Sequence, residues 1–470
     1  MSNFWILFYQ KNRIVNQHQF NIIKICFTRN YVLMKKFIKK IIWYEKIYNS
    51  FKNSFIYQLW KKTNWKLANF INWNPSKDFF IVGVTWTNWK TTTVNMLHKL
   101  FNDLVWPTVM VSTACIKIWN KTMVNDKKMT SLDVYQLQWI LADAKNQWCK
   151  IAILEASSQW LDQNRFEGIK FDYAVLTNIT RDHLDYHKNM DDYALAKKKL
   201  FKYVLGNWKN TKYATFPSDD KIWKERYNEL AFDKKMTFGL QNSSTIRAEN
   251  IVDNTRETTF DIIYLWNRYP TKTYLLWNYN IYNYLAALSV WIQIWLDIRD
   301  CISSLSGFTW VSGRMEKVEH NWVYYFIDFA HDPDALDKTL RFLHRQKWEN
   351  KLILVFWAPW NRDKLKRPEM GRLWWKFADI VIATDDDPDT ENRLNILKQL
   401  TQEIQKEDEM KKKLYIIPER YLAIKFATQI AKPGDIVMLA WKWHEPIQRT
   451  NFWTRKRNDK EKLLEILKNN

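Results

Sequence analysis

Glycine is scarce in this chain and tryptophan is abundant. Only 8 of the 470 residues are glycine, whereas 28 are tryptophan. Average usage of about 7% predicts roughly 33 glycines in a chain of this length, and the two residue types together number 36. Some tryptophans stand where a turn or a helix end favours glycine, as in Gln147-Trp148-Cys149. We therefore interpret most tryptophans as UGA codons that specify glycine and have been translated as tryptophan; the alternative is a tryptophan-rich protein.

Cysteines and long apolar runs are also few. The four cysteines are far apart and have no metal-ligand spacing, which excludes a disulfide framework and fits a reducing cytosol. No run approaches the roughly 20 apolar residues of a membrane span. The apolar stretch Phe4–Tyr9 is too short for a signal peptide and lacks a cleavage site, so export is not expected. We expect a cytoplasmic protein.

Acidic residues are outnumbered by basic ones. Lys and Arg total 72 against 50 Asp and Glu, a formal net charge of +22. This charge suits nucleotides, nucleic acid or an anionic membrane, but an AT-rich coding bias explains the scattered lysines equally well. Residues 34–42 are basic and amphipathic, which permits weak contact with a membrane surface. We favour a docked helix there, or a true start of the protein at Met34.

The order of apolar and amphipathic segments indicates an α/β protein of two or three domains. Residues 1–75 have helical character. From residue 76, apolar runs alternate with amphipathic segments, as in a mostly parallel sheet covered by helices. A change near residue 308 predicts a central P-loop domain at 76–308 and a Rossmann-like C-terminal domain at 309–470, with antiparallel strands at 237–274. The apolar runs occupy 79–84, 151–154, 173–176, 324–327, 352–356, 380–383, 414–417 and 436–439.

The stretch 85–93 has the pattern of a phosphate-binding loop between a strand and a helix. Lys90 and Thr91 follow a tight turn, where backbone N–H groups and a helix N-terminus hold a polyphosphate. Such a turn requires residues without a Cβ atom, whereas the indoles of Trp86 and Trp89 fill the space of the nucleotide. With glycine at both positions, the stretch predicts an ATP site. With tryptophan at both positions, it predicts a loop that does not bind a nucleotide. The predicted loop contacts are Trp86, Thr87, Asn88, Trp89, Lys90, Thr91 and Thr92.

Polar groups follow the next two strands. Glu155 ends one strand and, with the Thr91 hydroxyl, can hold Mg²⁺ beside the loop; the alternative is a glutamate that caps a helix. The segment 177–187 then places two histidines and two aspartates within six residues. That cluster alone could bind zinc, but the absence of cysteine and the nearby loop favour Mg²⁺ and substrate.

With the suspect tryptophans taken as glycine, three motifs together resemble the Mur ligase family. They are the phosphate loop, Glu155-Ala156-Ser157-Ser158 and the segment 178–187. The resemblance covers about residues 78–456 and implies an ATP-dependent, Mg²⁺-dependent ligase of peptidoglycan precursor synthesis. It is greatest to the members that add a diamino acid to UDP-N-acetylmuramoyl-L-alanyl-D-glutamate. We expect a monomer without a nucleic-acid partner.

The resemblance assigns roles residue by residue. Lys90 contacts the β- and γ-phosphates, and Thr91, Glu155 and His183 bind magnesium. Lys197 matches a lysine that CO₂ converts to a carbamate, which also takes part in metal binding; without the resemblance, Lys197 belongs to a solvated helix face. Further nucleotide contacts are Asn178, Asn280, Asn283, Arg314 and Asp328. Acceptor contacts are Thr130, Ser131, Ser157, Gln163 and Arg165. Contacts to the incoming amino acid are Arg362, Asp386, Asp387, Asp389 and Glu445.

Two features depart from the family pattern. Members that use meso-diaminopimelate commonly have Asp-Asn-Pro-Arg where this chain has Asp386-Asp387-Pro388-Asp389. An aspartate repels a distal carboxylate and attracts an ammonium group, which favours L-lysine. Only about 75 residues precede the loop domain, in place of a full uridine-binding domain, so the acceptor is held differently or is a different muramoyl peptide.

The expected chemistry is the activation of a carboxylate as an acyl phosphate, followed by attack of an amine. Another Mur-type or a folylpolyglutamate-type ligase is the alternative within the class. From other classes, a basic P-loop ATPase acting on nucleic acid has the charge in its favour, but the sequence shows no nucleic-acid module. The remaining alternative is an inactive homologue with a blocked loop.

Overall fold

The computed structural model describes residues 74–469 except for several short segments. The segments outside the description are 86–89, 114, 125–131, 133, 179–183, 208–210, 255–256, 277, 295–296, 310, 312, 329–332, 358–365, 385–391, 402–412, 441–446, 450–453 and 457. The helical segment predicted before residue 75, including residues 34–42, therefore lies almost entirely outside the described residues. None of the described helices combines the length and the apolar character that crossing a membrane requires.

The chain divides into two compact units. The first comprises residues 1–77, 133–143 and 164–169, and the second comprises the rest of the chain. In the first unit, the Ser76 hydroxyl donates to the Gly168 carbonyl at 3.3 Å. The second unit contains both large sheets.

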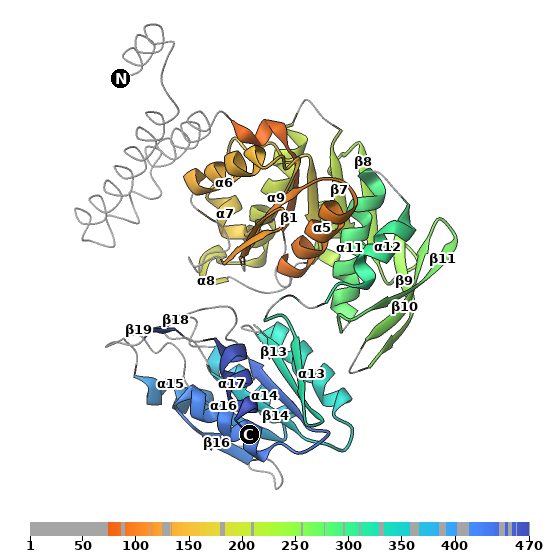
Figure 1. The fold of residues 1–470 in the computed structure, drawn as a ribbon. Coiled ribbons are helices and arrows are strands. Elements are labelled where there is room, and N and C mark those ends of the chain that lie inside the picture. Colours follow the sequence, from red (N-terminus) through yellow and green to blue (C-terminus); the bar gives the residue numbers. More distant parts are fainter. Residues whose placement is uncertain are drawn as a thin grey trace, which may run out of the picture. The chain divides into compact units, whose positions relative to one another are not determined.

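An eleven-stranded sheet forms the first half of the second unit (Figure 1). Its strand order is β11-β10-β9-β8-β7-β6-β1-β5-β2-β3-β4. The seven central strands, β9-β8-β7-β6-β1-β5-β2, pair in parallel. Antiparallel strands extend the sheet at both ends, β10 and β11 beside β9, and β3 and β4 beside β2. The strands are β1 (Phe80–Thr85), β2 (Thr108–Val111), β3 (Cys115–Ile118), β4 (Lys121–Val124), β5 (Ile151–Ala156), β6 (Tyr173–Leu176), β7 (Tyr213–Pro217), β8 (Lys234–Gly239), β9 (Ile246–Asp253), β10 (Thr258–Tyr264) and β11 (Asn267–Thr273).

A six-stranded sheet forms the second half, with the order β12-β13-β17-β14-β15-β16. All its pairs are parallel except β12 with β13. Its strands are β12 (Glu316–His320), β13 (Val323–Asp328), β14 (Leu352–Phe356), β15 (Ile380–Ala383), β16 (Lys413–Ile416) and β17 (Ile436–Ala440), and β18 (Ile447–Arg449) pairs with β19 (Thr454–Lys456) separately. The predicted α/β class with mostly parallel sheets is confirmed.

Helices connect the strands. They are η1 (Pro75–Asp78), α5 (Lys90–Leu104), α6 (Val134–Asn146), α7 (Ser158–Asp162), α8 (Leu184–His187), α9 (Met190–Leu205), α10 (Lys221–Arg226), α11 (Asn278–Ile294), α12 (Ile298–Ser306), α13 (Pro333–Gln346), α14 (Lys366–Phe377), α15 (Arg393–Thr401), α16 (Arg420–Ile430) and α17 (Asp459–Lys468). Helices α5, α11 and α12 pack together and share one apolar core with the large sheet.

The buried strands explain why the apolar runs were visible in the sequence. All eight predicted runs coincide with strands. Seven of these strands are largely buried, and a parallel strand covered on both faces is apolar throughout, whereas β16 is an edge strand with exposed ends. The antiparallel strands predicted within 237–274 are β9, β10 and β11, which Figure 1 shows as a long ribbon; β8, by contrast, pairs with β9 in parallel. Strands β2 and β7 were not predicted, since β2 has only four residues and β7 mixes polar and apolar ones.

A buried ion pair fastens α16 to α17. The Arg420 guanidinium donates to both oxygens of Asp459 and to the Ala440 carbonyl, and both side chains are fully buried. We expect Asp459→Asn to lower the free energy of unfolding by about 3–5 kcal/mol, because it leaves the arginine charge buried without its carboxylate. Urea denaturation measures this difference.

A matched control lies on the same helix. Glu465 forms an exposed ion pair with Lys462, and Glu465→Gln is expected to change the free energy of unfolding by less than about 1 kcal/mol. Similar effects of the two substitutions would contradict a dominant role of burial.

Candidate active site

The predicted phosphate loop lies between the end of β1 and the start of α5. Strand β1 ends at Thr85 and α5 begins at Lys90, while Trp86, Thr87, Asn88 and Trp89 lie outside the described residues. The Thr85 hydroxyl donates to the Ala156 carbonyl at 2.9 Å. The strand and the helix that flank the predicted loop are therefore present in the structure.

Glu155 stands beside this loop. The parallel register of β1 and β5 pairs Val84 with Glu155, so the carboxylate lies at the carboxyl edge of the sheet, where open α/β folds bind ligands. The side chain is 3% exposed. The hydroxyl of the fully buried Thr91 donates to its Oε2 at 3.3 Å. The alternative of a helix-capping glutamate receives no support, since Ser157 caps α7.

Thr113 also contacts Glu155, and sequence reasoning missed it. Its backbone N–H donates to Oε2 at 2.9 Å and its hydroxyl donates to Oε1 at 2.8 Å. The sequence carried no signal for this contact, because Thr113 is 42 residues away and follows the unpredicted strand β2.

The donor set around Glu155 fits magnesium. A carboxylate and a threonine hydroxyl are hard oxygen ligands of the kind that Mg²⁺ prefers. Among the described residues, no group of three or more His, Cys, Asp and Glu side chains could hold a metal. His183, the remaining predicted magnesium ligand besides Lys197, lies outside the description.

Lys197 is fully buried on α9. Its Nζ atom lies 4.5 Å from the centre of the Tyr193 ring. The neighbouring lysines bind elsewhere: Lys198 pairs with Glu229, and Lys199 donates to Asp162 at 3.0 Å. The interpretation of Lys197 as part of a solvated helix face is therefore wrong. A charged amine is costly to bury unless it is paired or neutralised. Complete burial therefore sets Lys197 apart from Lys198 and Lys199.

The predicted acceptor residues adjoin the segment 186–187. The Ser157 hydroxyl caps α7 by accepting from the Trp160 N–H at 3.4 Å. The Gln163 amide donates to the Tyr186 hydroxyl at 3.2 Å. His187 is hydrogen-bonded to Ser158 at 3.0 Å. The structure thus brings the Ser157-Ser158 motif and the end of the His–Asp cluster together.

The remaining predicted acceptor and amino-acid contacts divide between described and undescribed residues. Arg165 is half-buried in the first unit. The others lie outside the described residues: Thr130, Ser131, Arg362, Asp386, Asp387, Asp389 and Glu445.

Asn280 and Asn283 are both buried within α11. The Asn283 amide oxygen accepts from the Thr93 hydroxyl at 3.1 Å, and its nitrogen donates to Asn280 at 2.9 Å. Asn280 in turn donates to the Leu276 carbonyl at 2.7 Å. These bonds tie α11 to α5, so Asn283 supports the loop helix in this structure.

Asp328 is the last residue of β13 in the six-stranded sheet, and Arg314 lies two residues before the start of β12. The Asp328 carboxylate accepts from the Met315 N–H at 2.7 Å. Burial raises the pKa of Tyr279 well above its ordinary value, the Asp328 charge raises it further, and Arg314 lowers it. The three side chains are thus electrostatically linked.

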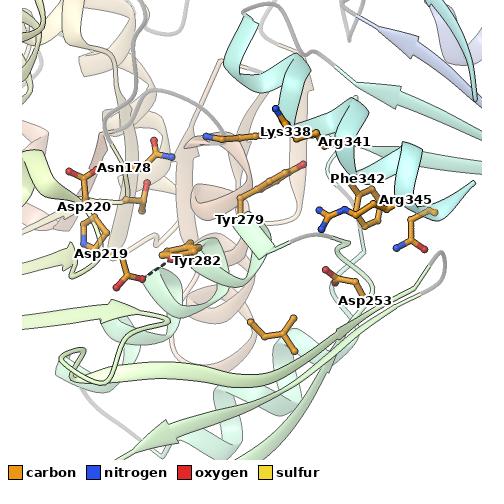
Figure 2. A pocket seen from close by; sticks show the side chains of 14 residues that line it. Asn178, Asp219, Asp220, Asp253, Tyr279, Tyr282, Lys338, Arg341, Phe342 and Arg345 are labelled. Carbon is orange, nitrogen blue, oxygen red and sulfur yellow. Dashed lines mark hydrogen bonds between the residues drawn. The ribbon is translucent and has the colours of Figure 1, made fainter. Parts of the chain in front are cut away.

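A cavity of about 690 Å³ opens next to Tyr279 (Figure 2). Its volume lies within the range of small-molecule sites. Carboxylates from the segments after β7 and at the end of β9 line it together with basic side chains of α13. The Tyr282 hydroxyl donates to Asp219 at 2.6 Å, and Figure 2 marks this bond with a dashed line. Burial, followed by this carboxylate, raises the pKa of Tyr282. The lining residues are Thr177, Asn178, Pro217, Asp219, Asp220, Ile251, Asp253, Tyr279, Tyr282, Lys338, Arg341, Phe342, Arg345 and Gln346.

Of the predicted nucleotide contacts, Asn178 lines this cavity. The basic residues Lys338, Arg341 and Arg345 also line it, and sequence reasoning missed them. Their spacing of three and four residues places them along one face of α13, a signal that is common on solvated helices and therefore weak.

A P-loop frame, a buried carboxylate beside it and a cavity at the carboxyl edge define the class as an α/β nucleotide-binding enzyme. Two family models match the chain: the Mur ligase middle domain at residues 84–291 and the Mur ligase, glutamate ligase domain at residues 313–440. The chain belongs to the Mur ligase family. The predicted class of ATP-dependent, peptide-bond-forming ligase is thereby confirmed.

Particular relatives cover most of the chain. It is 34% identical over 405 residues to UDP-N-acetylmuramoyl-L-alanyl-D-glutamate–2,6-diaminopimelate ligase 1 of Clostridium acetobutylicum, covering 85% of this chain and 80% of the relative. A solved structure of a ligase of that name is 28% identical, with a TM-score of 0.62 and coverage of 87% and 83%. The MurF ligase of Thermotoga maritima in complex with ADP shares the fold at 17% identity, with a TM-score of 0.63 and coverage of 86% and 83%.

Proposed function

We propose that the protein adds a diamino acid to the D-glutamate carboxylate of UDP-N-acetylmuramoyl-L-alanyl-D-glutamate, using ATP and an acyl phosphate intermediate. The observation that carries this proposal is the buried Glu155 carboxylate, hydrogen-bonded to Thr91 at the start of the loop helix. The names of the relatives support the acceptor and the class of amino acid.

In the proposed reaction the chain mainly aligns and neutralises charge. The acceptor carboxylate attacks the γ-phosphorus of ATP in line, and ADP leaves with Lys90 beside its phosphates. The amine of the diamino acid then attacks the acyl phosphate, loses a proton and displaces phosphate. Thr91, Glu155 and His183 would hold Mg²⁺, which when bound neutralises charge on the transferred phosphoryl group.

Lys197 is proposed to act as a carbamate. The lysine ammonium first loses a proton, and the neutral amine attacks CO₂. A C–N bond forms and a second proton is released, so that a buried cation becomes an anion with two oxygen ligands. Complete burial of Lys197 supports the proposal, because an exposed lysine would lose its carbamate to water. Carbon-13 NMR of the protein in labelled bicarbonate detects the adduct, and Lys197→Arg should abolish the signal.

We propose that the nucleotide base and ribose bind in the cavity near Tyr279, where Asn178 is one of the lining residues. Asn280, Asn283, Arg314 and Asp328 remain proposed nucleotide contacts from the resemblance. We further propose that the enzyme works in the cytoplasm as a monomer. The three described cysteines are free, which suits a reducing compartment.

The amino-acid substrate is proposed to be L-lysine, on the basis of Asp389. Relatives at about 34% identity are named for diaminopimelate, whose distal carboxylate an aspartate repels. We expect amino-acid-dependent ADP release in the presence of the UDP-muramoyl dipeptide to be at least about tenfold faster with lysine, a difference of about 1.4 kcal/mol.

Asp389→Arg is the informative variant, since it introduces the arginine of the family pattern and should reverse the preference. A preference of the unaltered enzyme for diaminopimelate would overturn the lysine assignment alone. No ADP release with either amino acid, from protein that binds ATP, would overturn the proposed function.

A further inference from the structure

Five tryptophans have left-handed backbone conformations. In the described part of the chain, twelve residues other than glycine have positive φ angles, and five of them are tryptophan: Trp119, Trp148, Trp266, Trp322 and Trp348. Their φ values lie between 50° and 66°. A positive φ is rare for bulky residues, whereas glycine adopts it freely.

Three of the five occupy two-residue β-hairpin turns. Trp322 follows Asn321 between the paired residues His320 and Val323, and both turn residues have positive φ angles. This is the pattern of a type I′ turn, for which Asn-Gly is the preferred sequence.

Trp266 occupies the same second position between Tyr264 and Asn267. Trp119 occupies the first position between Ile118 and Lys121, where a type II′ turn has glycine. All three turns therefore require, at the tryptophan position, the residue that has no Cβ atom.

The other two tryptophans follow helices. After α6, the Cys149 N–H donates to the Ala144 carbonyl and the Trp148 N–H donates to the Lys145 carbonyl, both at 3.0 Å. This pair of bonds defines a Schellman motif with Trp148 at the left-handed position, which is usually glycine. Trp348 has a left-handed conformation two residues after the end of α13.

Packing offers no reason for indole rings at these places. Four of the five residues are between 67% and 96% exposed and therefore bury little apolar surface in return for an unfavourable backbone, while Trp119 is 47% exposed. We propose that these five positions are glycine in the natural protein, encoded by UGA, and that the same holds for Trp86 and Trp89 in the phosphate loop. The backbone observation is independent of the proposed function.

Peptide mass spectrometry of the protein purified from its own source tests the proposal, together with the codons of the gene. We expect UGA codons and glycine masses at the five turn positions and at positions 86 and 89. Tryptophan masses or UGG codons at the five turn positions would overturn it, whatever the catalytic activity of the protein.

A second inference concerns Thr113 and rests on the proposed function. Strand β2 pairs in parallel with β5, with Val111 opposite Leu154, so the residues after β2 lie beside Glu155. The turn is closed by Ser112, whose N–H and hydroxyl both donate to the Cys115 carbonyl, at 3.0 and 2.8 Å. Thr113 is thus held on a short connection that returns directly into β3.

Thr113 fixes both oxygens of the carboxylate. Its N–H and hydroxyl donate to different oxygens of Glu155, and Thr91 donates to Oε2 as well. An ionised carboxylate has about four lone-pair sites. Counting contacts with the described residues, both sites on Oε2 are therefore used and one on Oε1 is left.

We infer that Thr113 is a positioning residue, which holds the Glu155 carboxylate in the plane that presents Oε1 to the magnesium ion of Mg-ATP. Partners behind a metal ligand typically contribute about 10–100-fold to metal affinity. Thr113→Val removes the hydroxyl and keeps the shape and the backbone N–H, whereas Thr113→Ser keeps the hydroxyl.

The test uses the full chain with glycine at positions 86 and 89. Two quantities are measured: the Mg²⁺ concentration for half-maximal ADP release, and Mn²⁺ affinity in the ADP complex by electron paramagnetic resonance. We expect Thr113→Val to weaken both at least about tenfold, with kcat at saturating Mg²⁺ changed less, and Thr113→Ser to restore both.

Glu155→Gln distinguishes an error about Thr113 from an error about the proposed magnesium site. If it weakens metal binding while Thr113→Val does not, the inference about Thr113 is wrong and the proposed site stands. If Glu155→Gln leaves metal binding unchanged, the proposed magnesium site is itself wrong. A loss of thermal stability in Thr113→Val with unchanged metal affinity would assign the residue a structural role only.

Discussion

The protein with glycine at positions 86 and 89 is expected to bind Mg-ATP at least about 100-fold more tightly than the protein with tryptophan there. A phosphate loop binds through backbone N–H groups, and an indole keeps the phosphates away from them. Loss of only two charge-assisted hydrogen bonds, at about 1.5–3 kcal/mol each, accounts for a change of this size. Isothermal titration calorimetry with a non-hydrolysable ATP analogue measures it.

The matched control removes indoles elsewhere. Glycine at positions 266 and 322, in the two type I′ turns, should raise thermal stability, because the left-handed strain disappears, and should leave ATP affinity unchanged. Equal ATP affinity of the forms with tryptophan and glycine at positions 86 and 89 would contradict the loop assignment. It would also contradict the interpretation as an inactive homologue, because that interpretation depends on indoles blocking the nucleotide.

The second large effect is expected at Lys90. This residue is the first of α5 and is half-buried beside the predicted loop. Its ammonium group is proposed to stabilise charge on the transferred phosphoryl group, so Lys90→Ala is expected to lower kcat by about 10²–10³-fold, the scale seen when one electrostatic donor is removed from an active site. Steady-state ADP release measures the loss.

Lys99 provides the control, since it lies on the same helix and pairs with Asp103 at 2.6 Å on the surface. Lys99→Ala should change kcat less than about twofold, in keeping with the small energies of exposed ion pairs. A fall of less than tenfold for Lys90→Ala would remove this lysine from the proposed mechanism.

Parts of the site that depend on chain order were accessible from the sequence. The strand before the loop and the strand that ends in Glu155 were both visible as apolar runs, because they are buried on both faces. Their parallel pairing then places Thr91 and Glu155 together. The proposed contacts at Asp386, Asp387, Asp389 and Glu445 remain predictions from the resemblance.

Parts that depend on contacts between distant segments were not accessible. Thr113 follows a strand too short to recognise, and its contact with Glu155 spans 42 residues. Lys197 belongs to a run of three lysines, which by itself is typical of an exposed helix. Only packing of α9 reveals that one of the three is buried.

The sequence by itself determined the fold class, the order of the motifs and the family resemblance, since apolar runs and motif residues can be recognised along the chain without knowing which segments pack together. It also raised the question of the tryptophans through composition. Tertiary structure decided which carboxylate contacts are made, which lysine is buried and which tryptophans occupy glycine-specific turns. These depend on φ angles and on distances between segments far apart in the chain, and neither residue type nor spacing specifies them.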